Sequence, residues 1–134
     1  MGIALSTTLH TSFDDAVRRT REALAEQGFG VLTEIDMKAT LKAKLGEDME
    51  DYLILGACNP PLAHRAVNVD RQMGLLLPCN VVVRSDPNAS GTVLVEAMDP
   101  QVLVDVTGEA ELRPVADEVA TKLQAAIDAL GASN

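Results

Sequence analysis

Apolar residues recur along the chain with two spacings, and these separate the expected helices from the expected strands. The longest helical stripe covers residues 112–130, where apolar side chains lie three or four positions apart, and Gly131 is expected to end the helix. A second stripe follows Ser12, a helix-capping residue, and stops at Gly28. Shorter helices are expected over residues 37–45, 60–67 and 100–106. Alternating or wholly apolar runs predict strands over residues 3–9, 29–36, 52–58, 75–83 and 92–97.

The order of these elements favours one fold class. Segment 86–91 is a turn signal rich in Asp, Asn, Pro and Gly, and it joins its two neighbouring strands as a hairpin. This mixed order favours an α+β two-layer sandwich, with helices on one face of a mixed or antiparallel sheet, over a doubly wound parallel sheet. Pro78 lies inside the most apolar run. Because proline lacks the N–H that a ladder needs, we expect a bulge or an unpaired position just before Cys79.

Length and composition limit what the chain can be. It is expected to form a single domain over residues 1–134. No apolar run is long enough to cross a membrane and no secretory signal is visible, so a cytoplasmic location is expected. A net charge of −9 with two Phe, one Tyr and no Trp opposes both phosphate neutralisation and base stacking. Nucleic acid is therefore not an expected partner.

The residues with distinctive chemistry gather in one stretch. Two Cys-Asn pairs, Cys58-Asn59 and Cys79-Asn80, lie at apolar runs, and His64 follows shortly after the first pair. Thiolates and an imidazole are the ligands of soft metals such as copper or zinc. Cys58, His64 and Cys79 are therefore candidate metal ligands, with a haem as another candidate occupant.

Three further side chains are candidates for the same pocket. Asn59 or Asn80 would orient the imidazole or donate to an oxyanion. Arg65 would bind an anion at the start of the helix that Pro60 opens, where free amides point outward. An ordinary surface ion pair is the alternative for Arg65.

Two other interpretations of the cysteines stay open. Free cysteine most often packs as a small buried hydrophobe, so both thiols could be inert. Alternatively, one thiol is reactive in redox or sulfur chemistry, and a Cys58–Cys79 disulfide would be transient because cytosolic thiols are normally reduced. A structural zinc site usually has four ligands and closely spaced cysteines, neither of which the sequence offers.

Three stretches of the chain resemble the bacterial and archaeal family known as domain of unknown function 302. They are residues 26–36, 54–64 and 74–81, which hold both Cys-Asn pairs in their apolar frames. The resemblance extends over nearly the whole chain. It implies a TATA-binding-protein-like topology, in the order strand, helix, four strands and helix, and a homodimer that does not bind DNA. Both Cys-Asn pairs and His64 coincide with the family's signature, but the resemblance implies no particular activity.

The sequence therefore leaves three functional hypotheses. The first is a small cytoplasmic homodimer that binds a ligand or a soft metal around Cys58, His64 and Cys79. The second is a thiol-dependent redox or sulfur-handling enzyme. The third is a structural dimer whose cysteines are buried and inert. None of the three assigns a catalytic residue.

Overall fold

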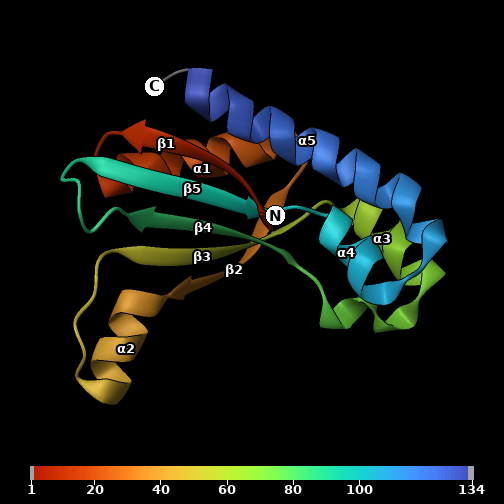
Figure 1. The fold of residues 1–134 in the computed structure, drawn as a ribbon, viewed down its shortest axis with the longest axis horizontal. Helices are drawn as coiled ribbons and strands as arrows, with labels where there is room; N and C mark the ends of the chain where they lie inside the picture. Colours follow the sequence, from red (N-terminus) through yellow and green to blue (C-terminus); the bar gives the residue numbers. More distant parts are fainter. Residues whose placement is uncertain (1, 133–134) are drawn as a thin grey trace.

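The computed structural model describes residues 2–132, in which five strands form a sheet with helices packed against it (Figure 1). The strands are β1 (Ala4–His10), β2 (Gly30–Asp36), β3 (Tyr52–Cys58), β4 (Cys79–Ser85) and β5 (Thr92–Met98). The α-helices are α1 (Phe13–Glu26), α2 (Met37–Leu45), α3 (Pro60–Val69), α4 (Gln101–Thr107) and α5 (Arg113–Ala132). Two short 3-10 helices are η1 (Arg71–Leu75) and η2 (Ala110–Leu112). The expected α+β class is confirmed.

The strands form one antiparallel sheet in the order β1-β5-β4-β3-β2. β4 and β5 pair as the expected hairpin, with Val83 opposite Val95. β1 pairs with β5 at one edge, and β2 pairs with β3 at the other. The β2–β3 register shifts between Val31 and Thr33, so a bulge interrupts this edge strand.

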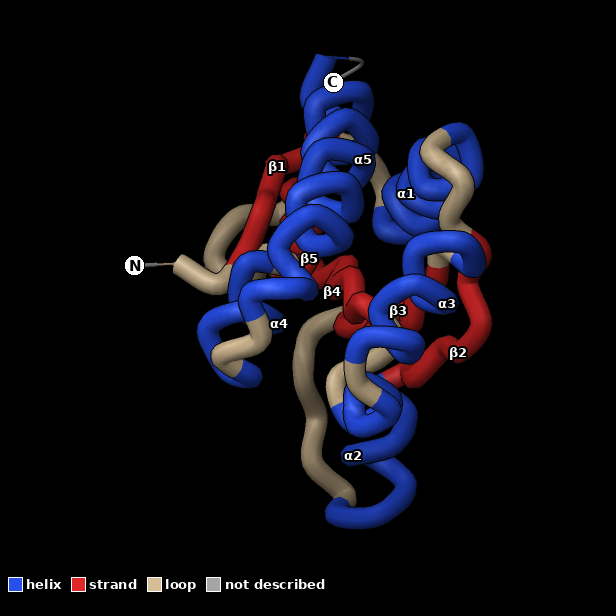
Figure 2. Tube along the Cα trace, turned by 90° about the vertical axis from the view of Figure 1, so that its right-hand side faces the viewer, coloured by secondary structure: helices blue, strands red, loops and turns tan. Residues whose placement is uncertain are grey.

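One face of the sheet forms the core with α1 and α5. Along β3, the buried residues Leu53, Leu55 and Ala57 alternate with the half-buried Tyr52 and Ile54. α5 contacts β1 and α1 contacts β4, and Figure 2, which looks nearly along the strands, shows both helices on the same side of the sheet. Because successive side chains of a strand point to opposite faces, the residues between the buried ones lie on the face away from these helices.

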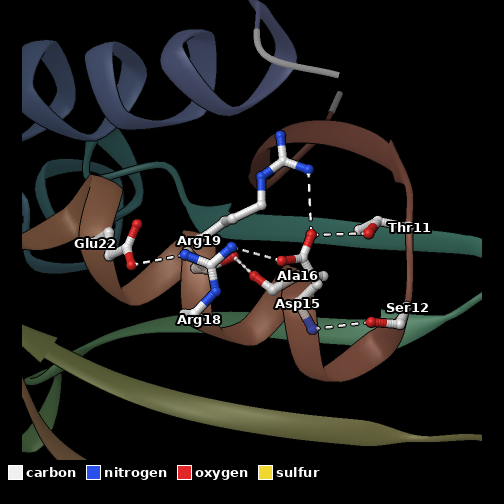
Figure 3. Close-up of polar contacts among 8 residues, drawn as sticks. Thr11, Ser12, Asp15, Ala16, Arg18, Arg19 and Glu22 are labelled. Atoms are coloured by element: carbon white, nitrogen blue, oxygen red, sulfur yellow. Dashed lines mark hydrogen bonds and ion pairs between the residues drawn. The ribbon is translucent and has the colours of Figure 1, made fainter.

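The polar contacts at the start of α1 show why this helix begins at Phe13 (Figure 3). The Asp15 amide donates a hydrogen bond to Ser12 Oγ over 3.1 Å, which is the cap expected from the sequence. The Asp15 carboxylate accepts hydrogen bonds from Arg18 and from Thr11 Oγ1, at 2.6 and 2.8 Å. These two hydrogen bonds lower the pKa of Asp15, and the one from Thr11 links the first turn of α1 to the residue that follows β1.

The strand expected over residues 75–83 begins only at Cys79. η1 ends at Leu75, residues 76–78 lead from it to β4, and the Leu77–Pro78 peptide bond is cis. Pro78 therefore precedes the strand, where no ladder needs its missing N–H, and the bulge expected there is wrong. The alternative expectation, an unpaired position just before Cys79, is confirmed.

Gly131 does not end α5, which continues to Ala132. A Cβ atom at Gly131 would lie 3.0 Å from Thr7 Oγ1 of β1. The glycine thus permits a close approach between α5 and β1, and it acts in packing and not as a helix stop. None of the helices within residues 2–132, α5 included, combines the length and apolarity that crossing a membrane requires.

α2 differs from the other α-helices because none of its side chains is buried. The Asp36 carboxylate caps its start by accepting a hydrogen bond from the Ala39 amide, and Gly46 ends it in a left-handed conformation. Figure 1 shows α2 extending away from the sheet beyond β2 and β3. Capping residues therefore fix both ends of α2, but none of its side chains packs into the core.

Candidate functional site

The two cysteines come together at one end of the sheet. Cys58 is the last residue of β3 and Cys79 is the first residue of β4. Ala57 lies opposite Cys79 in the antiparallel ladder, so Cys58 is the next residue along the neighbouring strand. Both thiols are free. Pairing of β3 with β4 is therefore what brings together two residues that are distant in sequence.

Both cysteines line a small cavity between this end of the sheet and the helices that follow it. The cavity has a volume of about 30 Å³. Its wall is almost entirely apolar and includes Leu62 of α3, Leu103 of α4 and Val115 of α5. The cavity thus lies at the junction of the sheet with three helices.

The two cysteines differ in their exposure to solvent. Cys58 is half-buried, whereas Cys79 is only 5% exposed. Burial raises the pKa of Cys79 to about 11, and the nearby Cys58 contributes to the same rise. At pH 7 only about one Cys79 side chain in 10,000 is a thiolate. Cys79 is therefore a neutral, buried thiol and not a nucleophile.

Asn59 lies in the cavity wall, but its polar atoms serve the fold. Its Oδ1 accepts a hydrogen bond from the Leu62 amide at 3.4 Å, which caps the start of α3. Its Nδ2 donates to the carbonyl oxygen of Gln27 at 3.4 Å, in the connection between α1 and β2. Both ends of the amide are thus engaged in joining α3 to that connection.

His64 lies outside the cavity. Leu62 and Ala66 are the buried residues of α3, and His64 falls between them in sequence, so it faces the other side of the helix. It is exposed, and Asn68 Nδ2 donates a hydrogen bond to its Nε2 at 3.3 Å. Within residues 2–132, no three His, Cys, Asp or Glu side chains gather in a way that could hold a metal ion. The structure does not bring His64 to the two cysteines.

Arg65 and Asn80 also lie outside the cavity. Arg65 Nη1 is 3.0 Å from Glu118 Oε1, and this exposed ion pair links α3 to α5. The surface ion pair considered for Arg65 is therefore confirmed. Asn80 is exposed on β4 opposite Gly56, on the sheet face away from α1 and α5. Neither side chain is available to a group inside the cavity.

Met73 is a cavity residue that the sequence analysis missed. It lies in η1, is 1% exposed and lines the cavity together with both cysteines. Its thioether adds a third sulfur-bearing side chain to the wall, and we call this space the sulfur cavity. One feature of the sequence could have identified Met73, namely its position in the segment that joins the two Cys-Asn pairs. A side chain buried in that segment is expected to lie near the two strand ends.

The family model for "Domain of unknown function DUF302" matches residues 5–130. The chain belongs to this family. An uncharacterized conserved DUF302 protein from Bacillus stearothermophilus, whose crystal structure is known, is 29% identical to it. That match covers 96% of this chain and 98% of the other, with a TM-score of 0.86. No curated protein matches the chain significantly. The DUF302 match includes every residue of the sulfur cavity.

Proposed function

We propose that this DUF302 protein is a small binding module and that the sulfur cavity is its binding site. The observation that carries the proposal is that Cys58 and Cys79, two residues with free thiols at the ends of neighbouring strands, both belong to the wall of one apolar cavity. Cys58 is half-buried at the end of β3, whereas Cys79 is buried. We also propose a cytoplasmic location, because free thiols persist in a reducing compartment.

Thiol-dependent redox or sulfur chemistry has weaker support. A nucleophilic cysteine needs a lowered pKa or an adjacent base, and burial raises the pKa of Cys79 instead. His64, the base that the sequence offered, is exposed on the outer side of α3. The amide of Asn59 is already engaged by backbone groups.

We further propose a homodimer in which a second copy covers the sheet face opposite α1 and α5, which we call the open face. The open face presents half-buried apolar side chains from the three central strands, namely Tyr52, Ile54, Val82 and Leu94. These side chains do not pack against the core cluster. A second copy of the chain would bury them without exposing new apolar surface.

α2 supports the same partner. It has nine residues and no buried side chain, whereas isolated helices shorter than about 12 residues are marginal in water. α2 carries three lysines and no acidic residue, so the rest of the chain carries −12 when the whole chain carries −9. Lys38 and Lys42 form ion pairs with Asp51 and Asp48 of the same chain, which leaves Lys44 to meet the acidic surface of a second copy.

Native mass spectrometry tests the binding-module proposal. Protein isolated without tag or chelator is compared with protein that has been unfolded in acid with chelator and refolded. We expect the isolated protein to carry a non-covalent mass that stripping removes, and Cys58 to react more slowly with iodoacetamide before stripping than after. Cys58→Ser should lose the mass, whereas His64→Ala, a change on the outer side of α3, should keep it. Equal masses and equal alkylation rates before and after stripping would contradict the proposal and favour inert cysteines.

A further inference from the structure

The sulfur cavity is a local gap in a core that is tightly packed elsewhere. Its wall includes four alanines from β3, α3 and α5, namely Ala57, Ala63, Ala66 and Ala116. Further along α5, Leu123 and Ile127 pack over β4 and β5, and the described residues there leave no room for a water molecule. The gap therefore lies where small side chains meet, and it does not reflect loose packing of the whole core.

The wall of the cavity offers little to a charged or polar occupant. Its residues, all within the described part of the chain, include no Asp, Glu, Lys, Arg or His. Both ends of the Asn59 amide are bonded to backbone groups, and burial keeps the Cys79 thiol neutral. A water molecule inside would lack the two to four polar partners that it needs. An apolar occupant, by contrast, gains the dispersion contacts that an empty space lacks.

The size of the cavity sets how much of an apolar molecule it can hold. The centre of a water-sized sphere can move through about 30 Å³ of it. An apolar protein cavity of about 150 Å³ holds one benzene molecule. The smaller space here therefore suits a few methyl or methylene groups, such as the end of a chain, better than a ring system or a whole cofactor.

The cavity also opens toward the surface. Leu77 and Pro78, which lead into β4, line it and are only half-buried, and the same holds for Cys58 of β3 and Ala63 of α3. Met73, by contrast, is 1% exposed and lies deep in the wall. One end of a ligand can therefore be buried against Met73 while the rest of the molecule stays in solvent.

We propose that the sulfur cavity binds the end of an aliphatic chain whose polar end remains in solvent. This inference rests on the proposed binding function of the cavity and names the class of its ligand, an amphiphile with an alkyl or acyl tail. Binding is non-covalent, and neither thiol reacts. Each methylene group that moves from water into the cavity should tighten binding about 4-fold until the cavity is full.

NMR titration of stripped protein with n-butanol, n-hexanol and n-octanol tests this inference, with the methionine methyl groups labelled with ¹³C. Met73 reports from the cavity, and Met98 of β5, which does not line it, is the internal control. We expect a saturable shift of the Met73 signal and a nuclear Overhauser effect to the terminal methyl group of the alcohol, with Met98 unchanged. Affinity should rise with chain length and level off once the added carbons lie outside the cavity.

Two alanine variants make the test specific. Ala63→Leu adds three carbon atoms at the half-buried edge of the cavity and should weaken octanol binding at least about 10-fold. Ala125→Leu makes the same change at a half-buried residue of α5 outside the cavity, and it should bind octanol like the unchanged protein. Backbone amide spectra check that both variants are folded. Unchanged affinity in Ala63→Leu, or equal shifts of Met73 and Met98, would overturn the assignment.

The result also separates this inference from the proposal on which it rests. If stripped protein binds none of the three alcohols while isolated protein still retains a removable mass, the aliphatic ligand fails and the binding module stands. If stripped protein binds none of them and isolated protein retains nothing, both fail.

Discussion

Gly56 is the residue at which the sheet tolerates a side chain least. A Cβ atom there would lie 2.1 Å from Thr33 Oγ1 of β2 and 2.8 Å from Pro78 Cγ. Real Cβ atoms do not approach other heavy atoms so closely, so a methyl group at this position requires the Thr33 hydroxyl to rotate away and the Pro78 ring to move. Packing of the Pro78 loop against β3 therefore requires a glycine at position 56.

Gly56→Ala should accordingly lower the free energy of unfolding by about 3 kcal/mol. Gly30→Ala is the matched control, because Gly30 lies in the neighbouring strand and a Cβ there meets no atom within 4 Å. That variant should stay within about 0.5 kcal/mol of the unchanged protein. Urea denaturation followed by circular dichroism measures both values. Equal losses in the two variants would show that crowding at Gly56 is not the cause.

Cys79 should make stability fall at alkaline pH. Burial raises its pKa from an ordinary value of 9.0 to about 11 in the folded protein. Below about pH 8 both folded and unfolded chains keep the proton, so the stabilising contribution is fully present. As pH rises from about 9 to about 11, the unfolded chain loses the proton first, and unfolding becomes easier by about 2–3 kcal/mol.

Urea denaturation of metal-free, reduced protein at neutral pH and at about pH 10.5 measures this loss. Cys79→Val serves as the control, since it fills similar space without an ionisable group while every other titrating residue is unchanged. The loss of stability at alkaline pH should be smaller in this variant by the stated amount. An identical loss in both proteins would refute the assignment to Cys79.

At the residue scale, the sequence predicted which residue types matter better than where their side chains point. The two cysteines were identified, and strand pairing brings them together. His64 was grouped with them by spacing alone, yet the helical period of α3 turns it away from the buried Leu62. Met73 was missed because a lone methionine before an apolar run has no pattern that separates a cavity residue from a core residue.

α3 depends on Asn59 at its start. The side chain of Asn59 caps the helix and also bonds to Gln27, so it links two elements that are distant in sequence. Asn59→Ala removes the cap and leaves buried backbone groups without their partner. It should lower the free energy of unfolding by about 2 kcal/mol.

Asn68→Ala is the matched control for this effect. Asn68 lies on the same helix but is exposed, with polar contacts to His64 and Arg71. We expect a change within about 0.5 kcal/mol. Thermal and urea denaturation compare the two variants, and a similar loss in both would mean that the cap contributes little.

At the element scale, helices and strands were predictable where a period repeated or a turn signal was strong. The β4–β5 hairpin and the start of α1 are examples, because turn residues and a capping serine specify them locally. Element ends that depend on tertiary contacts could not be predicted. Pro78 precedes β4 and does not interrupt it, and Gly131 lies within α5 because Thr7 is close. Neither fact is visible in local sequence.

The proposed dimer is a property of the whole molecule, and it has a direct test. Size-exclusion chromatography with light scattering should give the mass of two chains for the unchanged protein. Ile54→Lys places a charge in the middle of the open face and should give the mass of one chain, because an unpaired charge is costly in an interface. Leu75→Lys is the control, since Leu75 is 82% exposed on η1, away from that face.

Two outcomes would contradict the dimer. One is a single-chain mass for the unchanged protein. The other is a two-chain mass that persists in Ile54→Lys while circular dichroism shows the native fold. If only Leu75→Lys dissociates, the interface lies at the end of the molecule that carries η1 and not on the open face.

The bulge in β2 has a consequence for how copies of this protein can assemble. An unpaired edge strand can template further strands, and repeated addition of copies along such an edge builds filaments. In β2 the register shift leaves Leu32 outside the ladder and 68% exposed, and Glu34 and Asp36 are exposed as well. A neighbouring strand would meet an interrupted hydrogen-bond ladder and two negative charges there. The β2 edge therefore opposes open-ended growth by strand addition, which agrees with the proposed face-to-face pair.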